Sequence, residues 1–272
     1  MNEATRYWRR FLGIEWFKAD HYFRHYIYRY LGITLPKLKE QKSYWLKRGP
    51  SYMSDFLESG FHDREVFFQN MLIDALRRVE FDSFFEAGCG FGWNLRRVKE
   101  DFPDVRVGGL DFSEGQLANA RKYLAGLPVE PVFGDNCAMP FPDDHFDVGF
   151  SLGVFMNIHA SQIESALREM VRVSKKYIIH LEYDENHTTE ELREKRRIKR
   201  NIVSHDYLGL YKKLGQEVVA FHTYEDFGDA WAKHQADISS RFTRWQPFEG
   251  PEKYIFIMVK VDKAALPPAP AR

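Results

Sequence analysis

Between residues 63 and 183, short continuous apolar runs alternate with segments in which apolar residues recur at helical spacing. Short runs of apolar, β-branched and aromatic residues predict strands, and between them apolar residues recur at the three- and four-residue spacing of an amphipathic helix. The expected strands span 83–87, 105–111, 129–133, 146–151, 177–183, 217–221 and 254–261. The expected helices span 66–79, 93–100, 113–124, 163–171 and 204–214. Alternation of this kind predicts an α/β domain with a mostly parallel sheet.

Composition divides the chain further. Residues 1–62 are crowded with aromatic and basic side chains and are expected to form a helical extension or lid. A single α/β domain is expected over 63–262, with insertions at 184–253. Proline and alanine dominate residues 263–272, which predicts a disordered tail.

Charge and cysteine content exclude several classes of protein. The 39 Lys and Arg residues balance the 39 Asp and Glu residues, so the overall charge does not steer the chain toward nucleic acid. The two cysteines are too few for a disulfide framework and lack the paired spacing of metal ligands, so no metal is expected. No apolar run reaches the roughly 18 residues of a spanning helix, and the first residues lack a signal-peptide pattern. We therefore expect a soluble, cytoplasmic protein.

A glycine-rich turn follows the first expected strand, at residues 86–92 (EAGCGFG). Glycines permit backbone angles that a Cβ forbids, and they let the backbone approach a ligand closely. Asp111 and Asp135 follow at the ends of the next two strands, where carboxylates can bind a ribose or an adenine. We expect these groups to converge on one nucleotide-like ligand. A nicotinamide dinucleotide would require glycine at position 93, which is Trp93.

Five segments together resemble the motif set of class I S-adenosylmethionine-dependent methyltransferases in order and spacing. They are residues 86–92, 109–113 (GLDFS), 134–136 (GDN), 141–147 (FPDDHFD) and 151–158 (SLGVFMNI). The resemblance covers about residues 63–183. It implies a Rossmann-like, seven-stranded, mostly parallel sheet with helices on both faces, an antiparallel last strand and an N-terminal helical extension. It also implies S-adenosyl-L-methionine as the cofactor.

The resemblance assigns cofactor-binding roles to residues at the strand ends. Around the methionine part of the cofactor it places Glu86, Gly88, Gly90 and Gly92, with Ser151 and Leu152 near the sulfonium. Asp111 would hold the ribose and Phe112 would lie against the adenine, whose amino group would meet Asp135 with Asn136 beside it. From the residues themselves, the aromatic side chains of Tyr44, Trp45 and Tyr52 are candidates to close over the sulfonium by a cation–π attraction.

The methyl transfer expected here is an in-line displacement in which the protein mainly holds the reactants in place. A general base is needed only where the acceptor carries a proton that must leave early. The catalytic candidates near the ends of strands four and five are His159, Tyr183, His187 and His205. The family often has a histidine directly after the fourth strand, where this chain has residues 155–157 (FMN), so a base role in that loop stays open.

The acceptor-side segments predict a small polar or anionic metabolite. Arginine side chains in the basic run 193–200 could grip such an acceptor, and Phe242, Trp245 and Phe248 could form an aromatic wall. Residues 174–185 (SKKYIIHLEYDE) resemble methyltransferases associated with pseudaminic acid biosynthesis. We therefore predict methyl transfer from S-adenosylmethionine to an oxygen or nitrogen of such a metabolite.

Two alternatives stay open for the function: a methyltransferase acting on RNA or protein, and a cofactor-binding regulator without catalysis. Nucleic acid is the less favoured partner, because no recognisable RNA-binding module is present. Residues 1–35 interleave aromatic and cationic side chains, which suits a lid, a dimer contact, contact with a membrane surface or contact with nucleic acid. Both a monomer and a homodimer are compatible with the sequence.

Overall fold

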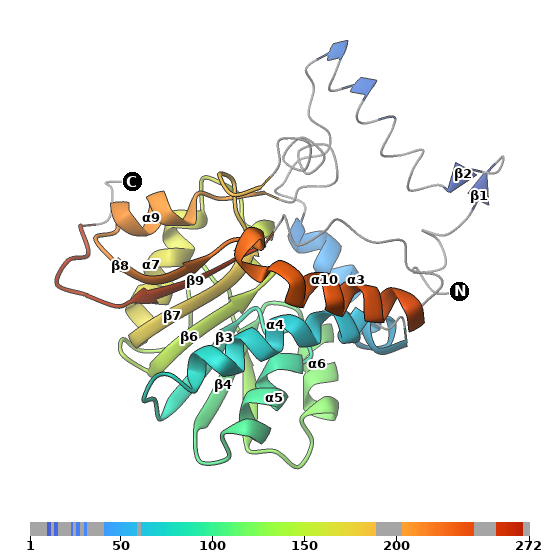
Figure 1. The fold of residues 1–272 in the computed structure, drawn as a ribbon. Helices are drawn as coiled ribbons and strands as arrows, with labels where there is room; N and C mark the ends of the chain where they lie inside the picture. The colour runs from blue at the N-terminus through green and yellow to red at the C-terminus, as the bar shows by residue number, and fades with distance from the viewer. Residues whose placement is uncertain are drawn as a thin grey trace.

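The computed structural model describes residues 41–58, 61–188, 203–241 and 254–268, together with residues 10, 11, 14, 15, 23, 26, 27, 30 and 31. Seven of its strands form one sheet in the order β5-β4-β3-β6-β7-β9-β8 (Figure 1). These strands are β3 (Ser83–Ala87), β4 (Arg106–Asp111), β5 (Val129–Phe133), β6 (Phe146–Leu152), β7 (Ser174–Tyr183), β8 (Glu217–His222) and β9 (Tyr254–Lys260).

Strand direction in this sheet confirms the fold predicted from the sequence. Strands β5, β4, β3, β6 and β7 pair in parallel, whereas β9 pairs antiparallel with both β7 and β8. All strands except β9 therefore end at the same edge of the sheet, and β9 begins there. This carboxyl edge is where open α/β sheets bind ligands.

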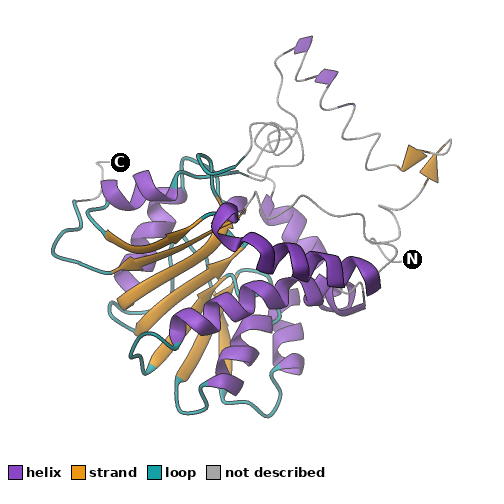
Figure 2. Ribbon diagram, viewed as in Figure 1, coloured by secondary structure: helices purple, strands orange, loops and turns teal. Residues whose placement is uncertain are grey.

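Helices pack on both faces of the sheet (Figure 2), and a hydrophobic core lies between the sheet and the helices on each face. Helices α4 (Phe61–Leu76), α5 (Trp93–Asp101), α6 (Glu114–Tyr123) and α10 (Tyr224–Arg241) contribute to one core, and α7 (Ile163–Val173) and α9 (Tyr207–Lys213) to the other. Successive side chains of β9 point to opposite faces of the sheet and so contribute to both cores. Phe256 and Met258 pack on the α4 side, and Ile255 and Ile257 pack on the α7 side. Burial on both faces explains why most residues of the central strands are apolar.

Several element boundaries differ from the prediction for local reasons. Helix α9 begins at Tyr207 rather than 204, because Asp206 caps it by accepting a hydrogen bond from the Gly209 N–H at 2.9 Å. Strand β7 begins three residues earlier than expected, at Ser174. Helix α10 was not predicted, and it contains a residue with non-helical backbone angles, Gly228.

Residues 263–268, the described part of the expected tail, lie against α7. The guanidinium of Arg168, on α7, donates a hydrogen bond to the Pro267 carbonyl at 2.7 Å, and Lys263 donates to the Arg172 carbonyl at 2.7 Å. These bonds fix the chain end against α7. Residues 269–272 lie outside the described residues.

Helix α3 (Gln41–Glu58) closes the carboxyl edge of the sheet by packing on α6. The two helices approach so closely that a Cβ at Gly49 would lie 2.2 Å from the Ser113 hydroxyl, and one at Gly115 would lie 2.7 Å from Pro50. The Asn119 amide adds hydrogen bonds to the carbonyls of Gly49 and Pro50, at 3.1 and 3.2 Å. The expected N-terminal helical region is therefore present over 41–58.

Little of the region before α3 is described. Strands β1 (Arg10–Phe11) and β2 (Ile14–Glu15) pair antiparallel, and Phe23, Tyr26 and Tyr30 are exposed. The lid, dimer and membrane-surface interpretations of residues 1–35 stay predictions. None of the described helices combines the length and the apolar character that crossing a membrane requires.

Candidate functional site

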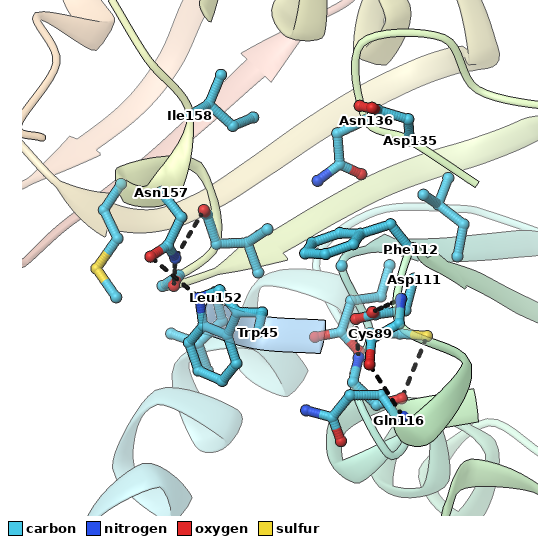
Figure 3. A pocket seen from close by; sticks show the side chains of 18 of the residues that line it. Trp45, Cys89, Asp111, Phe112, Gln116, Asp135, Asn136, Leu152, Asn157 and Ile158 are labelled. Atoms are coloured by element: carbon cyan, nitrogen blue, oxygen red, sulfur yellow. Dashed lines mark hydrogen bonds between the residues drawn. The ribbon is translucent and has the colours of Figure 1, made fainter. Parts of the chain in front are cut away.

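A cavity of about 610 Å³ opens at the carboxyl edge of the sheet. Its walls come from the ends of β3, β4, β5 and β6, from α3 and α4, and from the first residue of β9. Figure 3 shows Trp45 of α3 on one side of this space and Phe112, Asp135 and Asn136 on the other. Segments far apart in the sequence thus meet at one site.

The glycine turn after β3 forms the floor of the cavity. Gly88 and Gly90 have positive φ angles of 73° and 55°, which favour glycine. A Cβ at Gly88 would also lie 2.4 Å from a methyl group of Val154, so the loop after β6 packs directly on the turn. Gly92 does not line the cavity: with φ of 87° it precedes α5, and a Cβ there would lie 2.7 Å from Leu124.

Asp111, the last residue of β4, connects this turn to α6. Its two carboxylate oxygens accept hydrogen bonds from the Gly90 N–H at 2.9 Å and the Ser113 N–H at 2.8 Å. Burial raises the pKa of Asp111 despite these bonds. Ser113 and Gln116 have the spacing of a capping box, and the Ser113 hydroxyl accepts a hydrogen bond from the Gln116 N–H at 3.4 Å. The Ser113 N–H, which the Gln116 side chain would bind in a complete capping box, is bound by Asp111 instead. The Gln116 side chain lines the cavity instead.

Glu86 lies at the centre of the cavity floor, near the end of β3. It is buried, and its Oε1 accepts a hydrogen bond from the Asn94 side chain at 2.7 Å. Burial raises the pKa of Glu86 to about 8; the Asn94 bond acts in the opposite direction, and the nearby Asp111 adds to the rise. The carboxyl group is therefore largely protonated at neutral pH when nothing else binds it.

Four buried oxygen atoms of residues lining the cavity accept no hydrogen bond from any described residue. They are Glu86 Oε2, Asn94 Oδ1, Gln116 Oε1 and Asn136 Oδ1. Leaving such an atom unsatisfied costs about 1–3 kcal/mol, so a complementary ligand would bring hydrogen-bond donors. S-adenosylmethionine meets this requirement with its ammonium group, its ribose hydroxyls and its adenine amino group.

Asp135 lies after β5, at one end of the cavity. Its Oδ1 accepts a hydrogen bond from the Cys137 N–H at 2.9 Å, and its Oδ2 forms an ion pair with Lys42 of α3. Burial acts to raise the pKa of Asp135, but the Lys42 and Cys137 bonds outweigh it and the pKa is lowered. The Lys42 ammonium also lies 5.8 Å from the centre of the Phe112 ring, so α3 reaches over this end of the cavity.

The end of β6 separates two residues that were predicted together. Leu152 lines the cavity, whereas Ser151 is fully buried beneath it. The Ser151 hydroxyl donates to Glu182 at 2.7 Å, and the same carboxylate accepts from the N–H groups of Val154 and Phe155 at 2.9 and 3.0 Å. Burial raises the pKa of Glu182 to about 7 against these bonds. Ser151 and Glu182 thus position the loop after β6 rather than facing a ligand.

Aromatic residues of α3 were predicted to cover the site, and two of them line it. Trp45 and Tyr52 face the cavity, with ring centres 5.3 Å apart, and the Trp45 indole N–H donates to Asn157 Oδ1 at 3.2 Å. That bond joins α3 to the loop after β6. Tyr44 does not line the cavity but packs edge-on against Trp45, with ring centres 5.4 Å apart.

Of the four predicted catalytic residues, His159 alone lines the cavity. Its Nδ1 accepts a hydrogen bond from the Ser161 N–H at 3.1 Å, so the neutral ring carries its hydrogen on Nε2. His205 is buried, which lowers its pKa to about 4, and its Nε2 is 3.1 Å from the Phe155 and Ile158 carbonyls.

The two other candidates lie outside the cavity wall. The His187 Nδ1 is 2.8 Å from a carboxylate oxygen of Asp184, and that carboxylate also accepts from the His187 backbone N–H. Tyr183 is buried on β7, and its ring packs edge-on against Tyr254 with ring centres 4.8 Å apart. The structure therefore brings most of the predicted cofactor residues together but disperses the predicted bases.

Sequence reasoning missed four polar residues of the cavity: Glu65, Asn94, Gln116 and Tyr254. Gln116 has capping-box spacing from Ser113, which does not indicate a cavity residue, and Tyr254 was treated only as the start of a strand. Asn94 follows the glycine turn by two residues, a position from which a helix residue can reach back to the strand end. Glu65 lies just before the apolar stripe that predicted α4, and no pattern distinguishes it from a surface carboxylate.

Some predicted acceptor-side residues lie outside the described part of the chain. They are the basic run 193–200 and the aromatic residues Phe242, Trp245 and Phe248. Within the described ranges, no group of three or more His, Cys, Asp or Glu side chains is arranged to hold a metal ion.

Comparison with known proteins identifies a family for the central part of the chain. A family model described as a methyltransferase domain matches residues 84–177. The demethylmenaquinone methyltransferase of Listeria monocytogenes serotype 4a is 29% identical over 152 residues, covering 52% of this chain and 61% of that protein. The chain therefore spans about three fifths of the length of this curated relative.

Solved methyltransferase structures share the fold. The magnesium protoporphyrin IX methyltransferase of Synechocystis PCC 6803, with bound S-adenosylhomocysteine, superposes with a TM-score of 0.57 at 12% identity, over 81% of this chain and 100% of that one. The geranyl diphosphate C-methyltransferase of Streptomyces coelicolor A3(2), also solved with S-adenosylhomocysteine, gives a TM-score of 0.55 at 15% identity, over 72% and 76%.

Proposed function

We propose that this chain, whose central part matches a methyltransferase-domain model, is a class I S-adenosylmethionine-dependent methyltransferase that transfers a methyl group to an oxygen or nitrogen atom of a small metabolite. The observation that carries this proposal is the single cavity in which Glu86, Asp111 and Asp135 meet. Three neighbouring strands, β3, β4 and β5, bring these acids to one edge of the sheet. The small-molecule names of the three similar proteins support a small acceptor.

The residues of the cavity fit the cofactor group by group. Glu86 Oε2 would accept from the ammonium of the methionine part, and the free lone pairs of Asp111 would accept from the ribose hydroxyls. Asp135 and Asn136 would accept from the adenine amino group, with Phe112 against the ring. When bound, S-adenosylmethionine supplies a methyl carbon already activated by a positively charged sulfur.

The residues that line the rest of the cavity favour an uncharged acceptor. Among the described residues Lys42 is the only Lys or Arg that lines it, and Lys42 is paired with Asp135. The basic run 193–200, which suggested an anionic acceptor, lies outside the described residues. The aromatic rings of Trp45, Tyr52 and Phe56 offer an apolar surface for the body of an acceptor.

The protein's part in the reaction would be to hold the nucleophile in line with the methyl carbon and to exclude water. Helix α3 covers the cavity, and the bond from Trp45 to Asn157 ties it to the loop after β6. His159 offers no free basic nitrogen, because its Nδ1 already accepts from Ser161. An acceptor that ionises readily would need no other base.

Transfer from S-adenosylmethionine with a labelled methyl group into a cellular metabolite extract tests the proposal. We expect label in a small-molecule fraction, at a rate that Asp111→Ala reduces strongly, and mass spectrometry of the product would assign the methylated atom. Label in RNA or protein instead would favour a macromolecular acceptor. Binding of S-adenosylhomocysteine without transfer to any fraction would favour a regulator.

A further inference from the structure

The cavity continues beyond the residues that fit the cofactor. Its far end is formed by Glu65 of α4, Tyr52 and Phe56 of α3 and Tyr254 of β9. In the sheet order, β9 lies five strand positions from β5, a distance on the order of 24 Å across the sheet. Tyr254 and Asp135 therefore lie toward opposite ends of the site.

Glu65 is a carboxylate enclosed in this end of the cavity. It is 4% exposed, and its Oε1 accepts hydrogen bonds from the Arg64 guanidinium at 2.9 and 3.3 Å. Consecutive helix residues do not normally face each other, so Arg64 folds back to reach its neighbour. Arg64 is itself buried, and its charge compensates that of Glu65. The Glu65 side chain lines the cavity, so its carboxylate lies within reach of a ligand bound there.

Two tyrosines flank Glu65. Burial raises the pKa of both tyrosines; the negative charge of Glu65 adds to the rise at Tyr52, and Tyr183 followed by Glu65 adds to it at Tyr254. Both hydroxyls therefore keep their protons at neutral pH. A Cβ added at Gly153 would lie 3.7 Å from the Tyr254 hydroxyl oxygen. That hydroxyl therefore lies beside the loop after β6, next to Leu152. This end of the cavity thus combines an acceptor oxygen, two hydroxyls and aromatic rings.

We propose that Glu65 and Tyr254 form the binding site for the methyl acceptor, which is an uncharged ring compound with a hydroxyl or amino group. Glu65 Oε2 accepts a hydrogen bond from that O–H or N–H, and the rings of Tyr52 and Phe56 pack against the body of the compound. A carboxylate on the acceptor would be repelled by Glu65, and a ring without a donor would gain no hydrogen bond from it. This assignment rests on the proposed function.

Four matched probes test the selectivity of the wild-type protein saturated with S-adenosylhomocysteine: 4-fluorophenol, 4-fluoroaniline, 4-fluorotoluene and 4-fluorobenzoate. Fluorine NMR titration gives a dissociation constant for each. We expect the phenol and the aniline to bind roughly tenfold or more tightly than the toluene, as a hydrogen bond to a charged group implies, and the benzoate to bind most weakly. Equal binding of toluene and phenol, stronger binding of benzoate, or no binding of any probe would overturn the proposal.

Variants locate the selectivity. Glu65→Gln should lower the phenol-to-toluene affinity ratio, because a neutral amide oxygen is a weaker acceptor than a carboxylate, and Tyr254→Phe, which keeps the ring, tests the hydroxyl separately. Glu80→Gln makes the same change at an exposed carboxylate on the opposite edge of the sheet and should keep the wild-type ratio. A wild-type ratio in a folded Glu65→Gln protein would overturn the proposal.

The affinity for S-adenosylhomocysteine, measured on every variant, separates this proposal from the proposed function. Glu65→Gln should leave that affinity within a few fold of wild type, which also shows that the variant folds. If Glu65→Gln does not fold, the wild-type probe series and Tyr254→Phe still decide the matter. If the wild-type protein does not bind S-adenosylhomocysteine, that result contradicts the proposed function rather than the acceptor site.

Discussion

Glu86 makes cofactor binding depend on pH, because its carboxyl must ionise to pair with an ammonium group. Its pKa is raised to about 8, mainly by burial. Each pH unit below that value should therefore weaken binding of S-adenosylhomocysteine about tenfold. Between pH 9 and pH 6 the loss of affinity amounts to roughly a hundredfold, and at pH 7 binding should release close to one proton per site.

Calorimetric titration across this range, in two buffers with different ionisation enthalpies, measures both the slope and the released proton. Glu86→Gln should remove both, because an amide of the same shape does not titrate. Its affinity should be lower than that of the wild type at pH 9 and should approach it at pH 6. Glu80→Gln should keep the wild-type slope. A flat wild-type profile, or a slope that survives in Glu86→Gln, would refute the reasoning.

The same raised pKa has a consequence for stability without ligand. A carboxyl whose pKa is higher in the folded chain than in the unfolded chain binds its proton more tightly when folded. Stability from Glu86 is thus present below the ordinary pKa of 4.5 and is lost as pH rises through about 8. Between pH 4.5 and about 8 the free energy of unfolding should fall by roughly several kcal/mol. Glu86→Gln should show a smaller fall over the same pH range.

Three further predictions concern residues around the glycine turn. Gly88→Ala should destabilise the protein by about 2 kcal/mol or more in chemical denaturation, because both its positive φ and the Val154 side chain oppose a Cβ. The control Gly126→Ala, with φ of 86° and no atom within 4 Å of the added Cβ, should cost only the backbone strain of about 1–2 kcal/mol. Asp111→Ala should weaken S-adenosylhomocysteine binding in calorimetry by roughly 10- to 100-fold, and unchanged affinity would contradict the placement of the ribose. Glu182→Ala should lower the free energy of unfolding by about 2–4 kcal/mol, since the loop after β6 loses an acceptor for several N–H groups; a loss below about 1 kcal/mol would argue that water replaces it.

The fold was predictable because strand and helix periods alternate clearly between residues 83 and 183. The strand ends, and with them Glu86, Asp111 and Asp135, followed directly from that alternation. Helix α10 escaped prediction, although Phe227 and Trp231 lie four residues apart and are buried on one face. The non-helical backbone at Gly228 interrupts the pattern between them.

Side-chain direction was the part that the sequence could not supply. Gln116 has the spacing at which its side chain would bind the Ser113 N–H. Only the three-dimensional path of β4 shows that Asp111 accepts the hydrogen bond from that N–H instead. Ser151 and Leu152 are neighbours on a strand, so they point to opposite faces and only one can reach the cavity. Glu65 becomes a cavity residue because Arg64 compensates its charge, a contact between adjacent residues that helical spacing does not suggest.

Because β9 runs antiparallel to β7, its first residue, Tyr254, joins residues from distant parts of the sequence at the site. Strands that terminate at the edge, within residues 86–136, would capture the shared methyl donor, whereas a strand that originates there contributes Tyr254. The codon for Tyr254 thus lies more than a hundred positions after those for the donor site, whereas the codons for Tyr52 and Glu65 precede them. A lineage could diversify the compound it modifies by changing the residues on either side, while the stretch 86–136 stays under unchanged selection.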